Sequence, residues 1–227
     1  MIASVHIADV GPAAALRILA RPPRPASVPG LRHANVAVAA PLSSSVTAKP
    51  QPGRIALLGF WDDDDAIDRF EADDPVAERL AGGWHSRLEP LRMHGSWPGV
   101  PTDLPTGRSV DHEGPAVVLT LGRLRISQAP RFLRTSAKAE GAAVEAPGML
   151  WGTGLARPPF VATCSLWESS AALSTYAYGR RDPSHPDAIH AGDEKDFHKQ
   201  SGFIRFRPYR SAGSLGGRNP LAPLSLE

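Results

Sequence analysis

The stretches IALLGFW at residues 55–61 and VATCSLW at residues 161–167 decide the fold, because they are two copies of one pattern. Each is a strand-like apolar run that ends in a tryptophan, Trp61 in the first copy and Trp167 in the second. The offset between the two tryptophans is 106 residues, from 61 to 167. An internal repeat of this kind constrains the fold more strongly than any single predicted element.

The similarity continues past the tryptophans into a predicted helix in each half. At the same offset, Phe70 falls on Tyr176 and Asp63 falls on Ser169. Aspartate and serine side chains both accept hydrogen bonds from the free N–H groups at a helix N-terminus. The sequence therefore predicts the order strand, tryptophan, cap and helix twice in one chain.

Further strands and helices flank this repeat and complete each half. Strand–helix pairs open the halves at residues 5–20 and 116–144, and strands close them at 84–90 and 203–209. Each half therefore follows the β-α-β-β-α-β order of ferredoxin-like folds. A sheet with both helices on one face leaves its other face bare, and two such sheets can bury their bare faces together. We predict an α+β fold of two tandem ferredoxin-like halves packed sheet to sheet as an intramolecular α+β barrel.

Clusters of proline and glycine mark the expected boundaries of the halves. Residues 1–97 form the first half, residues 98–115 a linker and residues 116–210 the second half. Residues 211–227 are rich in glycine and proline, and we expect them to form a flexible tail. The second half also carries an insertion at residues 179–191, between its second helix and its last strand.

The composition is that of a globular protein of 227 residues, 42% hydrophobic and 21% charged, with a net charge of +2. No basic run is interleaved with aromatic residues, so we expect no nucleic-acid partner. No apolar run approaches the roughly 20 residues that span a bilayer, so we expect no integral membrane segment. The single cysteine, Cys164, favours a cytoplasmic protein without disulfides. Because the chain supplies both halves, either a monomer or a homodimer is compatible with it.

Several short motifs of the chain resemble one known family. In the second half they are LTLGR at 119–123, PRFLR at 130–134, PPFVAT at 158–163, SLW at 165–167 and YAY at 176–178, followed by His185. In the first half they are GWHSRLEPL at 83–91 and HGSWPG at 94–99. Together they resemble the spheroidene monooxygenase-like family, of the dimeric α+β barrel type. The likeness covers residues 55–209, which is most of the chain.

This resemblance implies a monooxygenase-like oxidoreductase that acts on an apolar small molecule, such as a carotenoid or another isoprenoid. It also implies haem as the cofactor and an external electron donor. Haem iron needs an axial ligand, and His185 matches the family's histidine. Arg180 and Arg181 are the expected partners of the haem propionates, since guanidinium groups pair well with carboxylates. The alternative for all three residues is a solvated surface loop.

Four aromatic residues of the second half are the expected lining of the substrate pocket. Large aromatic side chains at such positions are equally able to serve as core packing, and that alternative stays open here. No catalytic residue is assigned from the sequence. The four residues are Trp151, Phe160, Trp167 and Tyr176.

Other ligand sets fit the sequence less well. A zinc site made of His185, His190, Asp193 and His198 matches no tight ligand spacing, and the charged stretch around His190 and His198 predicts solvation. Cys164 could bind haem iron as a thiolate, but its place in the middle of a predicted strand favours a small buried hydrophobic residue.

Two further polar features also have structural explanations. The run of four aspartates at residues 62–65 opens a predicted helix, where negative charge is favourable and caps free N–H groups. His85 and His94 lie in and just after the last predicted strand of the first half, and we expect them to be structural or exposed.

Two other functions stay compatible with the sequence. One is a cofactor-free oxygenase of the antibiotic-biosynthesis type, in which the substrate supplies the electrons. The other is a non-catalytic barrel that binds an apolar ligand. Oxygen uptake without a metal would indicate the first, and binding of hydrophobic dyes without oxygen uptake would indicate the second.

Overall fold

The computed structural model describes residues 1–42, 51–107, 109–178 and 197–222. The first half comprises β1 (Ile2–Asp9), α1 (Pro12–Ala20), β2 (Leu31–Pro41), β3 (Arg54–Trp61), α2 (Asp64–Asp73), α3 (Pro75–Leu80) and β4 (Trp84–Gly95). The second half comprises β5 (Ala116–Leu124), a 3₁₀ turn (Ile126–Gln128), α4 (Ala129–Val144), β6 (Met149–Arg157), β7 (Phe160–Trp167), α5 (Ser170–Tyr178) and β8 (His198–Gly213).

The eight strands form one closed antiparallel barrel in the order β1-β3-β2-β6-β7-β5-β8-β4. Within each half the order is that of a ferredoxin-like sheet, β4-β1-β3-β2 in the first and β8-β5-β7-β6 in the second. The two sheets are hydrogen-bonded to each other at both edges. The β4–β8 seam runs from Trp84↔Gly213 to Gly95↔Gly202, and the shorter β2–β6 seam from Val38↔Ala156 to Pro41↔Thr153. The predicted α+β barrel is confirmed, with hydrogen-bonded seams that the sequence did not indicate.

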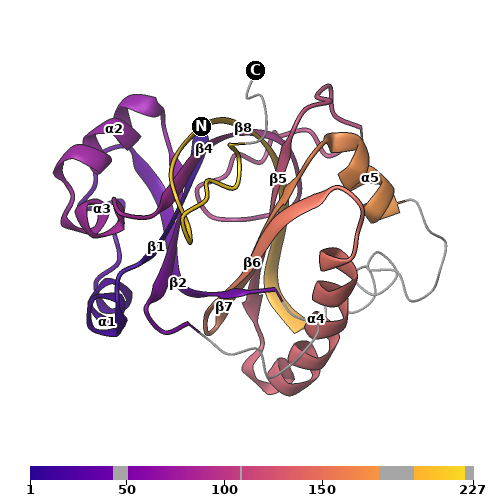
Figure 1. Ribbon diagram of the computed structural model, residues 1–227, viewed down its shortest axis with the longest axis horizontal. Coiled ribbons are helices and arrows are strands. Elements are labelled where there is room, and N and C mark those ends of the chain that lie inside the picture. Colours follow the sequence, from indigo (N-terminus) through magenta and orange to yellow (C-terminus); the bar gives the residue numbers. More distant parts are fainter. Residues whose placement is uncertain (43–50, 108, 179–196, 223–227) are drawn as a thin grey trace.

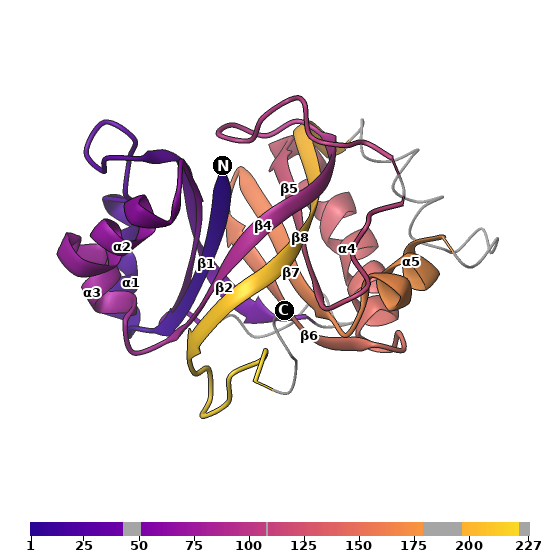
Figure 2. The same ribbon diagram turned by 90° about the horizontal axis from the view of Figure 1, so that it is seen from above.

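The helices lie outside the barrel in two groups on opposite sides. Figures 1 and 2 show α1, α2 and α3 against the first sheet and α4 and α5 against the second. Side chains alternate along each strand between the interior and the helix-covered outer face. In β1, Val5 and Ile7 point into the barrel core, whereas Ala8 belongs to the cluster beneath the helices.

The interior of the barrel is filled by side chains from both halves. Its largest members include Phe60, Trp84, Phe160 and Phe206, all less than 10% exposed. Such packing removes a large apolar area from water and is the main stabilising contribution to the fold. The space between the two sheets is therefore occupied by the chain itself.

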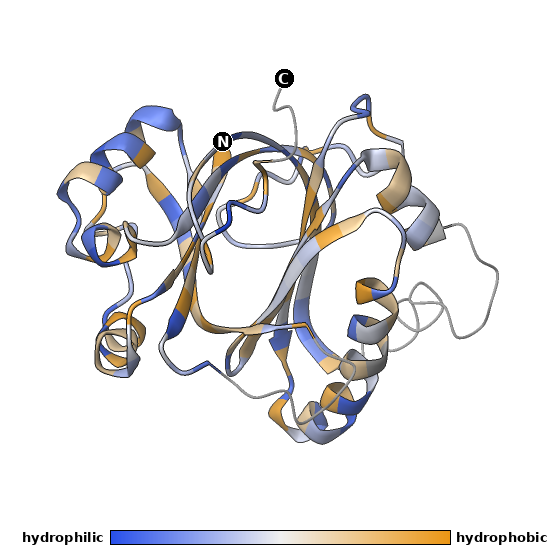
Figure 3. Cartoon of the chain, viewed as in Figure 1, coloured by the Kyte–Doolittle hydropathy of each residue, from blue (hydrophilic) through white to orange (hydrophobic). Residues whose placement is uncertain are grey.

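Both predicted caps are present at matching positions. The Asp63 carboxylate accepts from the Ala66 N–H at 2.9 Å, and the Ser169 hydroxyl accepts from the Ala172 N–H at 3.0 Å. The residues of α2 are mostly hydrophilic, as Figure 3 shows, and its apolar face contributes Phe70 to the cluster below. The caps explain why a helix starts three residues after each tryptophan.

The end of the chain differs from the flexible tail expected from residue 211. Strand β8 continues to Gly213 because its last residues pair with β4, up to Trp84↔Gly213. Beyond it, Leu221 is buried in the barrel core, and the Asn219 side chain accepts a hydrogen bond from Trp84 Nε1 at 3.1 Å. Residues 211–222 thus pack against the end of the barrel, which a glycine-rich composition does not reveal. In the described part of the chain, no helix is long and apolar enough to cross a membrane.

Candidate functional site

The outer face of the second sheet carries an aromatic pair between β7 and α5. Trp167 is buried at the end of β7, and its indole N–H donates to the Ser165 hydroxyl at 3.0 Å. The Tyr176 ring on α5 lies 4.9 Å from the Trp167 ring between centroids, at an angle of 30°. Leu173 completes the contact from the same helix. These residues fix α5 on the sheet.

The rest of this outer face is only half-buried. Thr120 on β5 and Val161 and Thr163 on β7 retain partial exposure beneath the helices. At the positions of the first half that match Val161 and Thr163, Ile55 and Leu57 are completely buried. The second sheet therefore offers a mixed, partly accessible surface where the first sheet is sealed by its helices.

A buried arginine, Arg205 on β8, also faces α5. Its guanidinium donates to the Ser174 hydroxyl at 3.4 Å, and the residue is 6% exposed. A charged group that is removed from water needs polar partners, so its position beneath α5 gives this face a polar character.

The four aromatic residues expected to line one pocket divide between the two faces of the second sheet. Trp151 packs against Trp84 in a tilted arrangement, with centroids 5.4 Å apart, and Phe160 packs on Trp97 at 5.8 Å, both at the barrel core. Trp167 and Tyr176 instead lie on the outer face. Phe160 and Trp167 are seven positions apart on one strand, an odd number, and therefore point to opposite sides. The single pocket lined by all four residues is not what the structure shows.

The expected haem-binding residues, His185, Arg180 and Arg181, lie outside the described residues, as do His190 and Asp193 of the alternative zinc set.

His198, which the sequence places in a solvated stretch, is half-buried at the start of β8. Its ring lies 5.3 Å from that of Phe132 on α4 and covers Gly122 on β5, where an added Cβ would meet it at 2.5 Å. The solvated assignment of His198 is therefore wrong, because the aromatic side chain of α4 encloses it.

Cys164 is completely buried in the barrel core. Burial raises the pKa of its thiol to about 12, so the thiol stays protonated at neutral pH. A thiolate is the form that binds haem iron, and the interior position gives no room for a macrocycle. Cys164 acts as a small hydrophobic residue, as its place in the strand predicted.

A cavity of about 570 Å³ opens at the end of the barrel next to the 3₁₀ turn. Three of its lining residues are cationic: Arg123 on β5, Arg125 directly after β5 and Lys199 on β8. The exposed surface of the lining is nevertheless mainly apolar, as is typical of small-molecule sites. The other lining residues are Leu124, Ile126, Ser127, Pro158 and Pro159.

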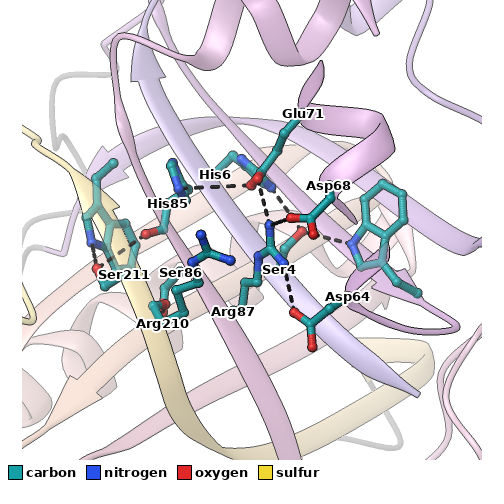
Figure 4. A network of polar contacts seen from close by, with 12 residues as sticks. Ser4, His6, Asp64, Asp68, Glu71, His85, Ser86, Arg87, Arg210 and Ser211 are labelled. Atoms are coloured by element: carbon teal, nitrogen blue, oxygen red, sulfur yellow. Dashed lines mark hydrogen bonds and ion pairs between the residues drawn. The ribbon is translucent and has the colours of Figure 1, made fainter. Parts of the chain in front are cut away.

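A polar cluster lies on the outer face of the first sheet, beneath α2 (Figure 4). Arg87 on β4 is 2% exposed and donates to Asp64 at 2.8 Å, to Asp68, and to Glu71 at 2.7 Å. Burial alone would lower the pKa of Arg87, but these three carboxylates together raise it above its usual value. The guanidinium is therefore always charged and ties β4 to α2.

Two histidines adjoin this arginine across the β1–β4 pair. His6 is 4% exposed, and its Nε2 lies 3.0 Å from the Ser4 hydroxyl oxygen, which also accepts from Trp61 Nε1 at 2.9 Å. Burial, with the charges of His85 and Arg87, lowers the pKa of His6 to about 3. Burial also lowers the pKa of His85, against an opposing effect of Glu71.

Sequence analysis missed most of this cluster. The sequence predicts that His85 is structural or exposed, and no motif in it points to His6 or Glu71. The register His6↔His85 brings the two imidazoles together from strands almost 80 residues apart. No local motif reports such a pairing, so only the strand order reveals it.

No family model matches the chain, but one curated protein and several solved structures resemble it. The chain is 27% identical over 192 residues to spheroidene monooxygenase of Rhodobacter capsulatus, covering 80% of this chain and 77% of that protein. The structure of aldoxime dehydratase OxdRE with butyraldoxime gives a TM-score of 0.53 at 10% identity, covering 91% of this chain and 79% of that one. A monooxygenase-like protein from Listeria innocua, at 15% identity, covers 89% and 93% with a TM-score of only 0.32.

The likeness to OxdRE concerns the fold alone, because the sequence identity is so low. The likeness to spheroidene monooxygenase is one of sequence and extends over both halves of the barrel. The predicted resemblance of this chain to the spheroidene monooxygenase-like family is therefore confirmed.

Proposed function

We propose that this chain is a monooxygenase-type oxidoreductase that acts on an apolar small molecule. The observation that carries the proposal is the 27% identity to spheroidene monooxygenase over 80% of the chain. An alignment that covers 80% of the chain reaches into both halves of the barrel and is not limited to one motif. The substrate class we infer from this similarity is a carotenoid or another isoprenoid.

We place the substrate on the outer face of the second sheet. Side chains such as Phe206 and Trp84 fill the barrel interior, which leaves no evident space for a long apolar molecule between the sheets. The outer face instead combines the Trp167–Tyr176 pair with half-buried threonine and valine side chains. Aromatic rings supply a large apolar contact surface at small entropic cost, which suits a substrate with few polar groups.

Haem is the cofactor we infer, and the described residues of the second half are chemically compatible with it. The outer face combines apolar, aromatic and small polar side chains, as a macrocycle with polar edges requires. His185 would be the axial ligand, and Arg180 and Arg181 would pair with the propionates. Bound haem would supply the activation of dioxygen, with electrons from an external donor.

The described residues would act by holding the substrate and limiting water. The Trp167 indole N–H is satisfied by Ser165, so the buried ring packs on the sheet without an unsatisfied donor. Tyr176 is half-buried, packs on that ring and holds α5 against the sheet, and it is the member of the pair that we propose contacts the substrate. Neither residue is proposed to transfer protons.

The test is an absorption spectrum of the purified protein before and after addition of haemin, in oxidised and dithionite-reduced forms. We expect a sharp Soret band that shifts on reduction and is lost in His185→Ala. The exposed His94 provides a matched control, and His94→Ala should keep the band. His198→Ala separates the two second-half histidines, because loss of the band in that variant alone would reassign the ligand.

A wild-type protein that retains no haemin would overturn the haem mechanism. Oxygen uptake in that haem-free protein with a quinol-type substrate would then identify a cofactor-free oxygenase. Binding of hydrophobic dyes without any oxygen uptake would identify a ligand-binding protein. The filled barrel interior argues against the ligand-binding protein, since a barrel that encloses a ligand needs an internal cavity.

A further inference from the structure

Three potential metal ligands meet on the outer face of the first sheet, away from the site proposed above. His6 on β1 and His85 on β4 are direct register partners, and their rings stack with centroids 5.5 Å apart at 28°. Glu71 on α2 extends toward them from above, as Figure 4 shows. One ligand atom from each of the three lies within 4.8 Å of the others.

The ligand set matches known metal chemistry. Two histidines and one carboxylate form the protein ligands of several zinc sites and of non-haem iron(II) sites. Ligand atoms bound to one ion at about 2.1 Å in tetrahedral geometry lie about 3.4 Å apart. His85 Nε2 and Glu71 Oε1 are already 3.9 Å apart. Small side-chain movements would therefore suffice to close the three ligands around an ion.

Glu71 divides its two oxygens between the arginine and the histidines. Its Oε2 accepts from Arg87 at 2.7 Å, which fixes the carboxylate. Its Oε1 is buried and has no hydrogen-bond partner among the described residues. A buried carboxylate oxygen without a donor is costly, and a cation there would satisfy it. Asp64 and Asp68 balance the charge of Arg87, so the cluster can accept a positive ion.

The two imidazoles are in the form that binds metals. Burial keeps His6 neutral at physiological pH, and metal ions bind the neutral ring. The contact with Ser4, itself held by Trp61, orients the His6 ring in the way that a second hydrogen bond orients many ligand histidines.

The second half provides an internal comparison at the matching positions. There, Thr120, Phe203 and Ala177 occupy the places of His6, His85 and Glu71. The fold itself therefore does not require these three polar residues on the outer face. Their presence in one half alone calls for a role beyond supporting the barrel.

We propose that His6, Glu71 and His85 bind a divalent transition-metal ion on the outer face of the first half. This site is independent of the haem proposal and uses none of its residues. Imidazole and carboxylate ligands suit a borderline divalent cation, and zinc and iron(II) are two such ions.

The experiment is a titration of the apo protein with Co²⁺ followed by visible absorption, with equilibrium dialysis against Zn²⁺ and, without oxygen, Fe²⁺. We expect one ion per chain and d–d bands of an ion with nitrogen and oxygen ligands. His85→Gln should weaken zinc binding by more than about 100-fold, because one of three protein ligands is lost. Ser4→Ala should weaken it by about 10- to 100-fold through loss of the ring's orientation.

Matched controls separate this site from other histidines and from general loss of structure. His94→Gln, on the same strand, and His185→Ala should both keep full zinc affinity. Circular dichroism checks that His85→Gln is folded. X-ray absorption of the wild-type zinc protein needs no variant and should show nitrogen and oxygen ligands without sulfur.

Equal zinc affinity in wild type and folded His85→Gln would overturn the proposal, as would sulfur ligation or no uptake of any of the three ions. Loss of zinc in His185→Ala would move the ion to another site and overturn it as well. Higher affinity and retention of Fe²⁺ over Zn²⁺ under anaerobic conditions would identify iron as the physiological ion. Because haem retention is measured separately, failure here leaves the proposed oxygenase untouched.

Discussion

The two halves of the barrel share one framework, but the helix that covers a buried arginine carries different side chains in each half. Arg87 on β4 and Arg205 on β8 occupy matching positions, both nearly inaccessible and both facing the helix that follows the tryptophan. In the first half that helix presents three carboxylates to the arginine. At the matching positions of α5 the second half carries Ser170, Ser174 and Ala177.

In the part of the chain that the structure describes, this outer face is therefore sealed more tightly in the first half than in the second, where we propose that the substrate binds. The first outer face is closed by fourteen buried residues and a charged network that holds α2 to the sheet. Among the residues that the structure describes, the cluster on the second outer face contains three fully buried residues, with Trp167 at the centre. A surface with unfilled, partly polar positions is where a ligand can bind, whereas a sealed surface has stability as its main effect.

The largest expected effect comes from removing the aromatic side chain that seals each half. Phe70→Ala should lower the free energy of unfolding by about 3–5 kcal/mol, because the ring is buried against Trp61 at 5.0 Å. Tyr176→Ala, at the matching and half-buried position, should lower it by only about 1–2 kcal/mol. Urea denaturation of both variants measures the contrast, and equal losses would show that the second half is sealed as tightly as the first.

The charged network should give the next largest effect. Arg87→Met should lower the free energy of unfolding by about 2–3 kcal/mol, since Asp64, Asp68 and Glu71 would face one another without their cation. The value is below that of a fully buried pair because solvent screens the exposed carboxylates. Arg210→Met, at the exposed register partner of Arg87, is the control and should change stability by about 0.5 kcal/mol or less.

A smaller effect should appear as a pH dependence that originates in the first half. The pKa of His6 falls from 6.5 unfolded to about 3 folded, so the unfolded chain binds more protons between these values. The free energy of unfolding should therefore decrease as pH falls below 6.5, by at most about 1.4 kcal/mol per pH unit for one histidine. The pKa values of Asp9 and Asp68 are lowered from 3.8 by folding, so the protonation of these carboxylates reduces the free energy of unfolding further only below that pH.

Denaturation curves at pH 7 and pH 5 in the presence of EDTA measure this slope without bound metal. His6→Gln should flatten it, and His94→Gln should not. The matching position of the second half is Thr120, which does not titrate. An unchanged slope in His6→Gln would assign the pH dependence to another group.

The smallest expected effect concerns a feature that the two halves share, the side-chain cap at the start of the helix that follows each tryptophan. Asp63→Ala and Ser169→Ala each remove a cap at matching helix starts, and each should lower the free energy of unfolding by about 1 kcal/mol. Thermal denaturation resolves such a difference. A loss confined to Asp63→Ala would show that the start of α5 is not held by its cap.

Much of the fold can be predicted from the sequence repeat, whereas the candidate functional site can be predicted only in part. The alternation of apolar residues and the caps at Asp63 and Ser169 are local, and they predict the main strands and helices, but not the additional helix α3 or the full length of β8. The sequence also contains the reason why the expected pocket residues lie on two faces of the sheet, since Phe160 and Trp167 are an odd number of positions apart on one strand. The enclosure of His198 by Phe132 required the packing of α4 on the sheet, which no local pattern contains.

The sequence by itself determined the element order, the two-half architecture and the resemblance to spheroidene monooxygenases, because these depend on local periodicity and short motifs. Only the tertiary structure decided which strands meet at the seams, which aromatic residues face inward, and that His6, His85 and Glu71 converge. The physical reason is that strand register joins residues far apart in the chain. A one-residue shift in the register of β1 or β4 would turn His6 or His85 to the opposite face of the sheet, away from Glu71.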